Sequence, residues 1–261
     1  MLNTSSPGPR TVLGSVRKVF AVIGIATLAL AGSVNVAAAA VSTPNPVATV
    51  EPSAGAVVGV AYPVTVTFST PVIDRGAAEH SLRVTTSAGT APTGKVTWLS
   101  NDVMRWTPDQ FYPAHSTISV VAEGFKTSFE TGATVLGVAD ISAHTFTVSI
   151  DGQVARTMPA SMGKPKHPTP VGSFTALSKE KTVVMDSRTI GIPLSDPEGY
   201  KLTVSDAVRV TWGGVYVHSA PWSVAQQGNS NVSHGCINLS PDNAAWYFNT
   251  VNIGDPIIIN A

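Results

Sequence analysis

The stretch Ser233-His234-Gly235-Cys236-Ile237-Asn238-Leu239 holds the only cysteine of the 261-residue chain, so no internal disulfide can form. A thiol becomes a nucleophile when a nearby imidazole takes its proton. Two histidines qualify: His234, two residues before Cys236, and His218, at the end of a strand-like segment. Gly235 allows a close approach of the backbone, so N–H groups there would face a carbonyl oxygen under attack. We therefore predict that Cys236 is a covalent nucleophile beside an oxyanion site.

Two other interpretations of these residues remain open. By residue type alone, a buried cysteine is more often a small hydrophobic side chain than a nucleophile. His218, His234 and Cys236 also supply the three ligands of an open zinc site. Neither a second cysteine nor a His-x-x-x-His spacing accompanies them, so we expect no metal and no other cofactor. His218 has no Asp or Glu within ten residues, so its second ring nitrogen needs another partner.

The segments around this stretch have the pattern of a mainly β domain, which we place at residues 128–261. Residues 145–150 lead into Asp151-Gly152, a turn that suits tight hairpins, and residues 153–158 would form the returning strand. Further predicted strands are residues 182–185, 201–204, 207–211, 215–218 and 257–259. One short helix is expected to run to about residue 249, with Ser240 as its cap, Pro241 at its first position and Asp242 near its positive end.

An earlier segment shows a different β pattern, with short alternating runs separated by Pro, Gly, Asn and Asp. Examples are residues 64–68, 82–85, 96–98 and 117–120. Period-two alternation with a turn every dozen residues or so predicts a small antiparallel β-sandwich, immunoglobulin-like but without a disulfide. We place this domain at residues 43–127 and expect it to have a spacing or docking role.

The first forty residues have the order of a secretory signal peptide. Arg10, Arg17 and Lys18 precede the apolar residues 19–30, and small residues follow up to Ala40. The alternative is an uncleaved membrane anchor, although the apolar run is slightly short of the ~20 residues that span a bilayer. Either way we expect an exported protein, in the periplasmic space or cell wall or anchored to the outer face of the plasma membrane.

The charge pattern argues against nucleic acid as a partner. Three of the sixteen basic residues lie in the leader and none of the sixteen acidic ones does, so the rest of the chain is mildly acidic. It contains no basic patch interleaved with aromatic residues. His167, beside Lys164 and Lys166, is interpreted as part of a solvated loop, with contact to an acidic peptide as the alternative. We expect a monomer.

The run from Ser233 to Asn238, together with His218 and Ser219, resembles the signature of L,D-transpeptidases with a YkuD-type catalytic domain. Gly163 and Thr169-Pro170-Val171-Gly172-Ser173-Phe174 are similar to a second feature of that family. The resemblance covers roughly residues 129–261. It is closest to the mycobacterial type, in which immunoglobulin-like modules precede the catalytic domain.

The resemblance implies a role for each matching residue. Cys236 would be the nucleophile and His218 the general base, held in its tautomer by the main-chain carbonyl of Ser219. His234, Gly235 and Cys236 would build the oxyanion site. The substrate pocket would be formed by Met185, Tyr200, Trp222, Ser233 and Asn238, with Asn238 also supporting the loop and Tyr200 on a lid-like hairpin. Many relatives carry Gly where this chain has Ser219, which leaves the main-chain carbonyl in place but puts the fit of the substrate in doubt.

The reaction implied by the resemblance is acyl transfer between peptidoglycan stem peptides. Cys236 would attack the third residue of a tetrapeptide donor, a diamino acid, and release the terminal D-alanine. An amine of a second stem's diamino acid would resolve the thioester, forming a cross-link between third residues. Carbapenem β-lactams would acylate the same thiol. The alternatives are hydrolysis of the thioester, as an L,D-carboxypeptidase, and a non-catalytic cell-wall-binding module.

Overall fold

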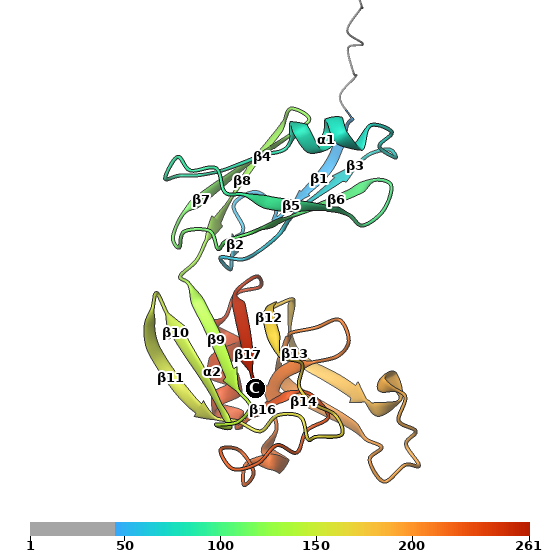
Figure 1. Ribbon diagram of the computed structural model, residues 1–261, viewed down its shortest axis with the longest axis vertical. Helices are drawn as coiled ribbons and strands as arrows, with labels where there is room; N and C mark the ends of the chain where they lie inside the picture. The colour runs from blue at the N-terminus through green and yellow to red at the C-terminus, as the bar shows by residue number, and fades with distance from the viewer. Residues whose placement is uncertain (1–44) are drawn as a thin grey trace, which may run out of the picture. The chain divides into compact units, whose positions relative to one another are not determined.

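The computed structural model describes residues 45–261, so the leader at residues 1–40 lies outside the described residues. Within the described part of the chain, no helix has the length and apolar character needed to cross a membrane. The described chain is mainly β and begins with a sandwich of two four-stranded sheets (Figure 1).

The sandwich confirms the alternating pattern read from the sequence. Its first sheet has the order β1 (Val47–Glu51), β3 (Val64–Phe68), β6 (Val103–Pro108) and β5 (Gly94–Trp98). Its second sheet has the order β2 (Val57–Val58), β8 (Phe125–Thr131), β7 (Thr117–Ala122) and β4 (Arg83–Thr86). In β3, Val64, Val66 and Phe68 are buried and the threonines between them are not. This period of two places one face of each strand in the core.

Two details of the sandwich differ from the sequence prediction. Strand β8 continues to Thr131, past the predicted domain end at residue 127, because it stays paired with β7 up to Glu130. A helix that was not predicted, α1 (Arg75–Ser81), begins after Asp74, whose carboxylate accepts a hydrogen bond from Ala77 N at 2.9 Å. Asp is a favoured N-cap residue, so this signal was present in the sequence.

The second domain combines a five-stranded and a four-stranded sheet. The five-stranded sheet has the order β11 (Gln153–Pro159), β10 (Thr145–Ile150), β9 (Val135–Asp140), β17 (Pro256–Asn260) and β12 (Gly172–Thr175). The four-stranded sheet has the order β13 (Ser178–Asp186), β14 (Lys201–Arg209), β15 (Tyr216–Ser219) and β16 (Ile237–Leu239). Residues of both sheets and of helix α2 (Pro241–Thr250) share one hydrophobic core, in which the Phe146 and Tyr247 rings meet edge to face.

The turn and the helix start that were predicted from local sequence signals in this domain are present. Asp151 and Gly152 both have positive φ, 47° and 80°, as the tight turn between β10 and β11 requires. Ser240 caps α2 by accepting a hydrogen bond from Asn243 N. One prediction is wrong: residues 201–204 and 207–211 were expected to be two strands, but β14 is continuous from Lys201 to Arg209. Asp206 has φ 51° within this strand, which explains the turn-like sequence at that point.

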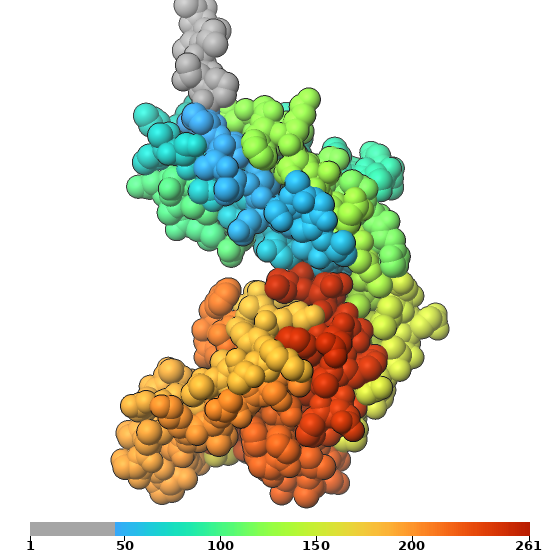
Figure 2. Space-filling model, turned by 180° about the vertical axis from the view of Figure 1, so that it is seen from behind, coloured from blue at the N-terminus to red at the C-terminus, as the bar shows by residue number. Residues whose placement is uncertain are grey.

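Strands β13 and β14 form a long hairpin whose pairing runs from Ser178↔Arg209 to Asp186↔Lys201. The chain between the strands contains the 3-10 helix η1 (Ser187–Ile190) and a left-handed Gly191. We call residues 187–200 the lid. In Figure 2 the hairpin projects from the rest of its domain.

Candidate active site

Parallel pairing of two short strands brings His218 next to the chain that carries Cys236. Strand β15 pairs with β16 in the register His218↔Asn238, and Cys236 directly precedes β16. His218 and Cys236 line the same cavity, which has a volume of about 310 Å³. The sequence left open whether His218 would approach Cys236 from a neighbouring strand, and the pairing in the sheet brings it there.

The ring of His218 is held in one tautomer. Its Nδ1 donates a hydrogen bond to the main-chain carbonyl of Ser219 at 2.9 Å, so Nε2 keeps a free lone pair. The residue is 2% exposed, and this burial lowers the pKa of His218 to about 4. The imidazole is therefore neutral at physiological pH and able to accept a proton.

Cys236 is a partly buried thiol at the cavity wall. Its Sγ lies 3.6 Å from the carbonyl oxygen of Gly214, and the residue packs beside Val204 and Tyr216. Burial raises the pKa of the Cys236 thiol to about 12. Because burial also lowers the pKa of His218, the resting pair is a neutral thiol and a neutral imidazole. Formation of a thiolate at Cys236 would therefore require transfer of its proton to an acceptor such as His218.

The loop before Cys236 is held by Ser233. The Ser233 hydroxyl donates to the main-chain oxygen of Cys236 at 2.7 Å and accepts from Gly235 N at 3.1 Å. This second bond conflicts with the predicted oxyanion role of the Gly235 N–H, because that donor is already engaged. Gly235 itself has φ 117°, a conformation that side chains rarely allow.

Asn238 lies in β16, the strand that follows Cys236, and is 3% exposed. Its side-chain amide donates to Ser223 Oγ at 3.1 Å. Its main chain exchanges two hydrogen bonds with Ser161, at 2.9 and 3.1 Å. This arrangement fits the supporting role that the resemblance implies, and Asn238 also lines the cavity.

The other predicted substrate residues line the same cavity, namely Met185, Tyr200, Trp222 and Ser233. The Trp222 ring lies 6.0 Å from the His218 ring between centroids, and the residue is half exposed at the rim. The Tyr200 ring, on the lid, lies 4.9 Å from the His234 ring. Apolar and aromatic side chains thus line the cavity together with His218 and Cys236.

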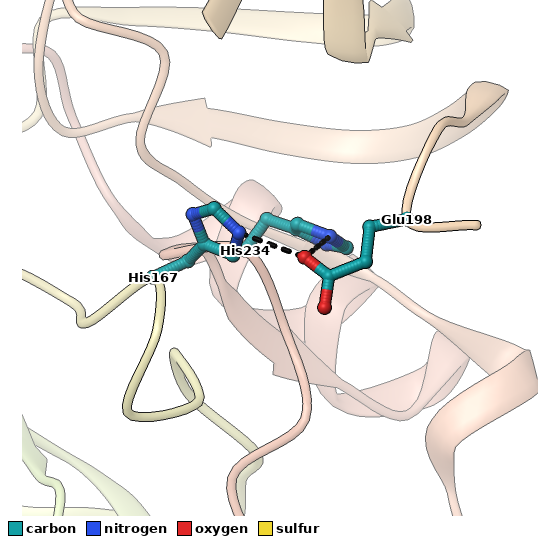
Figure 3. Close-up of side chains that lie close together, drawn as sticks. All are labelled: His167, Glu198 and His234. Carbon is teal, nitrogen blue, oxygen red and sulfur yellow. Dashed lines mark hydrogen bonds and ion pairs between the residues drawn. The ribbon is translucent and has the colours of Figure 1, made fainter. Parts of the chain in front are cut away.

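The side chain of His234 belongs to a cluster that the sequence analysis missed. Figure 3 shows the carboxylate of Glu198, a residue of the lid, next to the rings of both His167 and His234. His167 Nε2 donates to Glu198 Oε2 at 2.9 Å, and Lys164 Nζ donates to His234 Nε2 at 3.3 Å. Burial, followed by the nearby Lys164 charge, lowers the pKa of His234. The His234 ring is therefore neutral and accepts the hydrogen bond from Lys164. Its side chain is part of this cluster.

The same cluster has the composition of a metal site. One donor atom each from His167, Glu198 and His234 lies within 4.8 Å of the others. Two ammonium groups already contact Glu198: Lys164 Nζ at 3.0 Å and Lys166 Nζ at 3.3 Å. A divalent cation would be repelled by both lysines, so we assign no metal to this cluster. The three ligands considered from the sequence, His218, His234 and Cys236, differ from this set.

Comparisons with known proteins agree with the fold. Residues 135–259 match the model of the YkuD L,D-transpeptidase catalytic domain, and residues 31–124 match a bacterial Ig domain. The chain is 60% identical over 245 residues to L,D-transpeptidase 1 of Mycobacterium tuberculosis, covering 93% of this chain and 97% of the relative. It is 50% identical over 262 residues to the probable L,D-transpeptidase 3 of the same organism, covering 92% and 96%.

Solved structures give the same result. An L,D-transpeptidase from Mycobacterium smegmatis superposes with a TM-score of 0.80 at 72% identity, covering 84% of this chain and 100% of that one. The LD transpeptidase LdtMt1 in complex with imipenem superposes with a TM-score of 0.76 at 62% identity, covering 82% and 99%. The chain belongs to the L,D-transpeptidase family, with a bacterial Ig domain followed by a YkuD catalytic domain.

Proposed function

We propose that this enzyme cross-links peptidoglycan by joining the third residues of two stem peptides through a thioester on Cys236. The observation that carries the proposal is the pairing of β15 with β16. It brings a neutral His218, oriented by the Ser219 carbonyl, into one cavity with the chain's only thiol. An imidazole and a thiol in a shared cavity are suited to nucleophilic acyl transfer.

The first half of the reaction acylates the enzyme. The Cys236 proton passes to His218 Nε2 while Sγ forms a bond to the carbonyl carbon of the diamino acid. The C–N bond to D-alanine then breaks, and the imidazolium returns the proton to the leaving amine. The peptide remains on sulfur as a thioester. Because Gly235 N–H is engaged by Ser233, the Cys236 N–H is the donor that we assign to the oxyanion.

The second half transfers the acyl group to an amine. The acceptor amine attacks the thioester carbonyl, its proton moves to His218, and the C–S bond breaks to regenerate the thiol. Water at the same position would give hydrolysis and an L,D-carboxypeptidase activity instead. The walls formed by Met185, Tyr200 and Trp222 favour the amine by restricting the access of water. We propose carboxypeptidase activity only as a side reaction.

Carbapenem β-lactams are the proposed covalent inhibitors. A relative at 62% identity was solved in complex with imipenem, and L,D-transpeptidase 3 of M. tuberculosis was solved with a faropenem-derived adduct. In this chain a β-lactam carbonyl in the cavity would meet the same thiol and imidazole. We also propose that the protein acts outside the plasma membrane, exported or anchored by residues 1–40, and functions as a monomer.

The test follows the mass of the protein and its products together. The protein is incubated with a disaccharide-tetrapeptide, and the intact mass, released D-alanine and peptide dimers are measured. We expect a transient adduct, D-alanine and dimers from the wild type, and none of these from Cys236→Ala. Tripeptide without dimer would make the enzyme a carboxypeptidase. An unmodified wild-type protein without product would contradict catalysis and leave a wall-binding role.

A further inference from the structure

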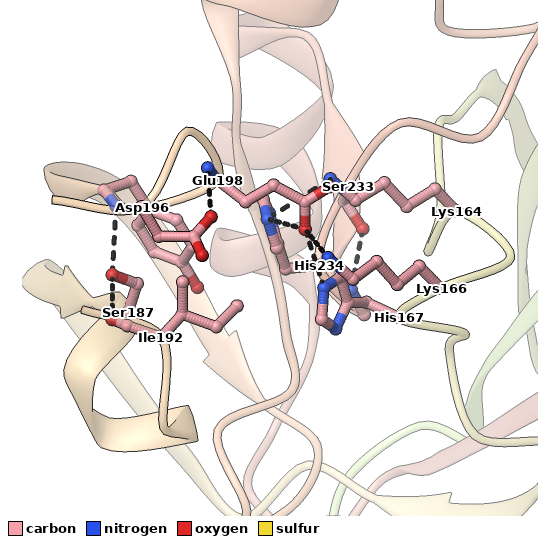
Figure 4. Close-up of polar contacts among 11 residues, drawn as sticks. Lys164, Lys166, His167, Ser187, Ile192, Asp196, Glu198, Ser233 and His234 are labelled. Atoms are coloured by element: carbon pink, nitrogen blue, oxygen red, sulfur yellow. Dashed lines mark hydrogen bonds and ion pairs between the residues drawn. The ribbon is translucent and has the colours of Figure 1, made fainter. Parts of the chain in front are cut away.

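The Glu198 carboxylate contacts ammonium and imidazole groups (Figure 4), and Glu198, Lys164 and His234 line the same cavity as Cys236. Lys164 Nζ contacts Oε1 at 3.0 Å, and Oε2 receives Lys166 at 3.3 Å and His167 at 2.9 Å. His234 Nε2 is 3.8 Å from Oε2. These four residues come from two segments outside the lid, the loop after Gly163 and the loop before Cys236. Glu198 is thus a carboxylate of the lid held in a carboxylate-binding site of the domain body.

Glu198 is also the polar attachment of the lid to the body. Among the described residues, every other hydrogen bond of residues 187–199 stays within the hairpin, as between Ser187 and Ile192 or between Asp196 and Gly199. The conformation of the lid is therefore held by hydrogen bonds within the hairpin. A competitor for the partners of Glu198 would release the lid without breaking any other hydrogen bond.

The groups that contact Glu198 would also bind the carboxylate of another molecule. Charge-assisted hydrogen bonds from ammonium groups to carboxylates are among the stronger polar contacts in proteins. Hydrogen bonds from Lys164 and then His167 lower the pKa of Glu198 to about 2, so this site favours an ionised carboxylate strongly. Of the described residues lining the cavity, Lys164 is the one with a permanent positive charge. A substrate carboxylate in the cavity would therefore be drawn to Lys164.

We propose that Lys164 forms the binding subsite for the free C-terminal carboxylate of the donor peptide, and that Glu198, which also contacts Lys166 and His167, occupies this subsite when no donor is bound. This inference rests on the proposed function, in which the leaving residue is the C-terminal D-alanine. The carboxylate of that residue lies one residue, about 3.5 Å of extended chain, beyond the attacked carbonyl. A group recognising it must share the cavity with Cys236, as Lys164 does.

The subsite gives the enzyme a way to select its donor. A donor that ends after the fourth residue places its carboxylate at Lys164 and displaces Glu198. A donor whose fourth residue is amidated or extended by another residue carries no charge there, and Glu198 keeps its place. Glu198 thus competes for Lys164 more effectively against uncharged donors than against charged ones.

The experiment measures kcat/KM for D-alanine release from the disaccharide-tetrapeptide and for release of alaninamide from the C-terminal carboxamide of the same donor. We expect the wild type to prefer the acid by about tenfold or more, the size expected for a charge-assisted contact. Lys164→Met should reduce this preference to near unity, and Lys164→Arg should keep most of it. Glu198→Gln should lower KM for the acid, because the internal competitor is lost.

The controls separate the possible outcomes. Lys126→Met, at an exposed position of the sandwich, makes the same substitution away from the cavity and should keep the wild-type preference. An unchanged acid preference in folded Lys164→Met, or a higher KM for the acid in Glu198→Gln, would overturn the subsite while leaving the proposed function intact. If Lys164→Met does not fold, Glu198→Gln and Lys164→Arg decide the question. Failure of the wild type to release D-alanine from the tetrapeptide would instead count against the proposed function.

Discussion

His218 is 2% exposed, and its Nδ1 donates a hydrogen bond to the Ser219 carbonyl, which leaves Nε2 as a free acceptor. A buried imidazole without a carboxylate partner resists protonation, because its charge would be poorly solvated. The missing Asp or Glu therefore has a chemical effect. It favours a neutral imidazole and a neutral thiol at rest, and in the proposed reaction charge appears only as the thiol attacks.

The burial of His218 should make stability depend on pH. Its pKa is about 4 in the folded protein and about 6.5 in the unfolded chain, so between these values the unfolded chain binds more protons. Stability should therefore fall as pH decreases through this window, by about 2 kcal/mol from this group at pH 5 relative to pH 7. Urea denaturation of wild type and His218→Gln at several pH values measures this difference.

The wild type must be compared with the His218 variant because Asp255 changes the stability with pH in the opposite direction. Burial raises the pKa of Asp255 to about 6, so its contribution falls as pH rises. The same pH dependence in His218→Gln as in wild type would show that His218 is not the group responsible.

At the scale of elements, the loop after β11 supports both the lid and the loop before Cys236. Gly163 forms a parallel bridge with Ser233, and its N–H donates to Thr169 Oγ1 at 2.8 Å. The next residue, Lys164, donates its N–H to the main-chain oxygen of Ser233 at 3.0 Å. One compact loop therefore holds Lys164 in register with the segment that leads to Cys236.

Gly163→Ala should disturb this loop. A Cβ at this position would lie 2.2 Å from the His167 carbonyl oxygen and 2.4 Å from Thr169 N, both backbone atoms that cannot move freely. We expect a loss of about 1–3 kcal/mol in stability and slower acylation by a carbapenem. Gly76→Ala is the control: its Cβ has an ordinary 3.5 Å contact in helix α1, so stability should stay the same or rise slightly. Wild-type stability and acylation in Gly163→Ala would contradict this explanation.

At the scale of the whole molecule, the sandwich and the catalytic domain have separate hydrophobic cores. Phe129 packs edge to face against Tyr112 in the sandwich, and Phe146 packs in the same way against Tyr247 in the catalytic domain. Both phenylalanines are fully buried, and within residues 45–261 no residue belongs to both cores. The reactive cavity is lined only by residues of the second domain.

These separate cores predict separable effects of mutation. Phe129→Ala and Phe146→Ala should each destabilise their own domain by about 3–5 kcal/mol. At a temperature where both variants retain their secondary structure, Phe129→Ala should be acylated by a carbapenem at close to the wild-type rate, and Phe146→Ala should be acylated more slowly. Calorimetry and intact-mass kinetics measure the two effects. An equal loss of acylation in both variants would mean that the sandwich and the catalytic domain are not independent of each other.

The sequence alone determined the features that depend on local chemistry. Asp151-Gly152 predicted its hairpin because both residues tolerate positive φ, and Ser240 with Pro241 predicted the start of α2 through capping. Period-two alternation predicted the sandwich. The chain's only thiol and His218 were identified as a candidate pair by residue type, with the family resemblance supplying the Ser219 carbonyl as the orienting partner.

The tertiary structure decided which distant groups meet. Parallel pairing of β15 with β16 set the neighbours of His218, and the hairpin brought Glu198 to His167, 31 residues away in the sequence. Lys164 and His234, 70 residues apart, meet in the same cluster. The Gly235 N–H was assigned to the oxyanion from the sequence but is bound by Ser233 in the folded loop. Such contacts depend on strand register and loop closure, which arise from packing across the whole domain and leave no periodic signal in the local sequence.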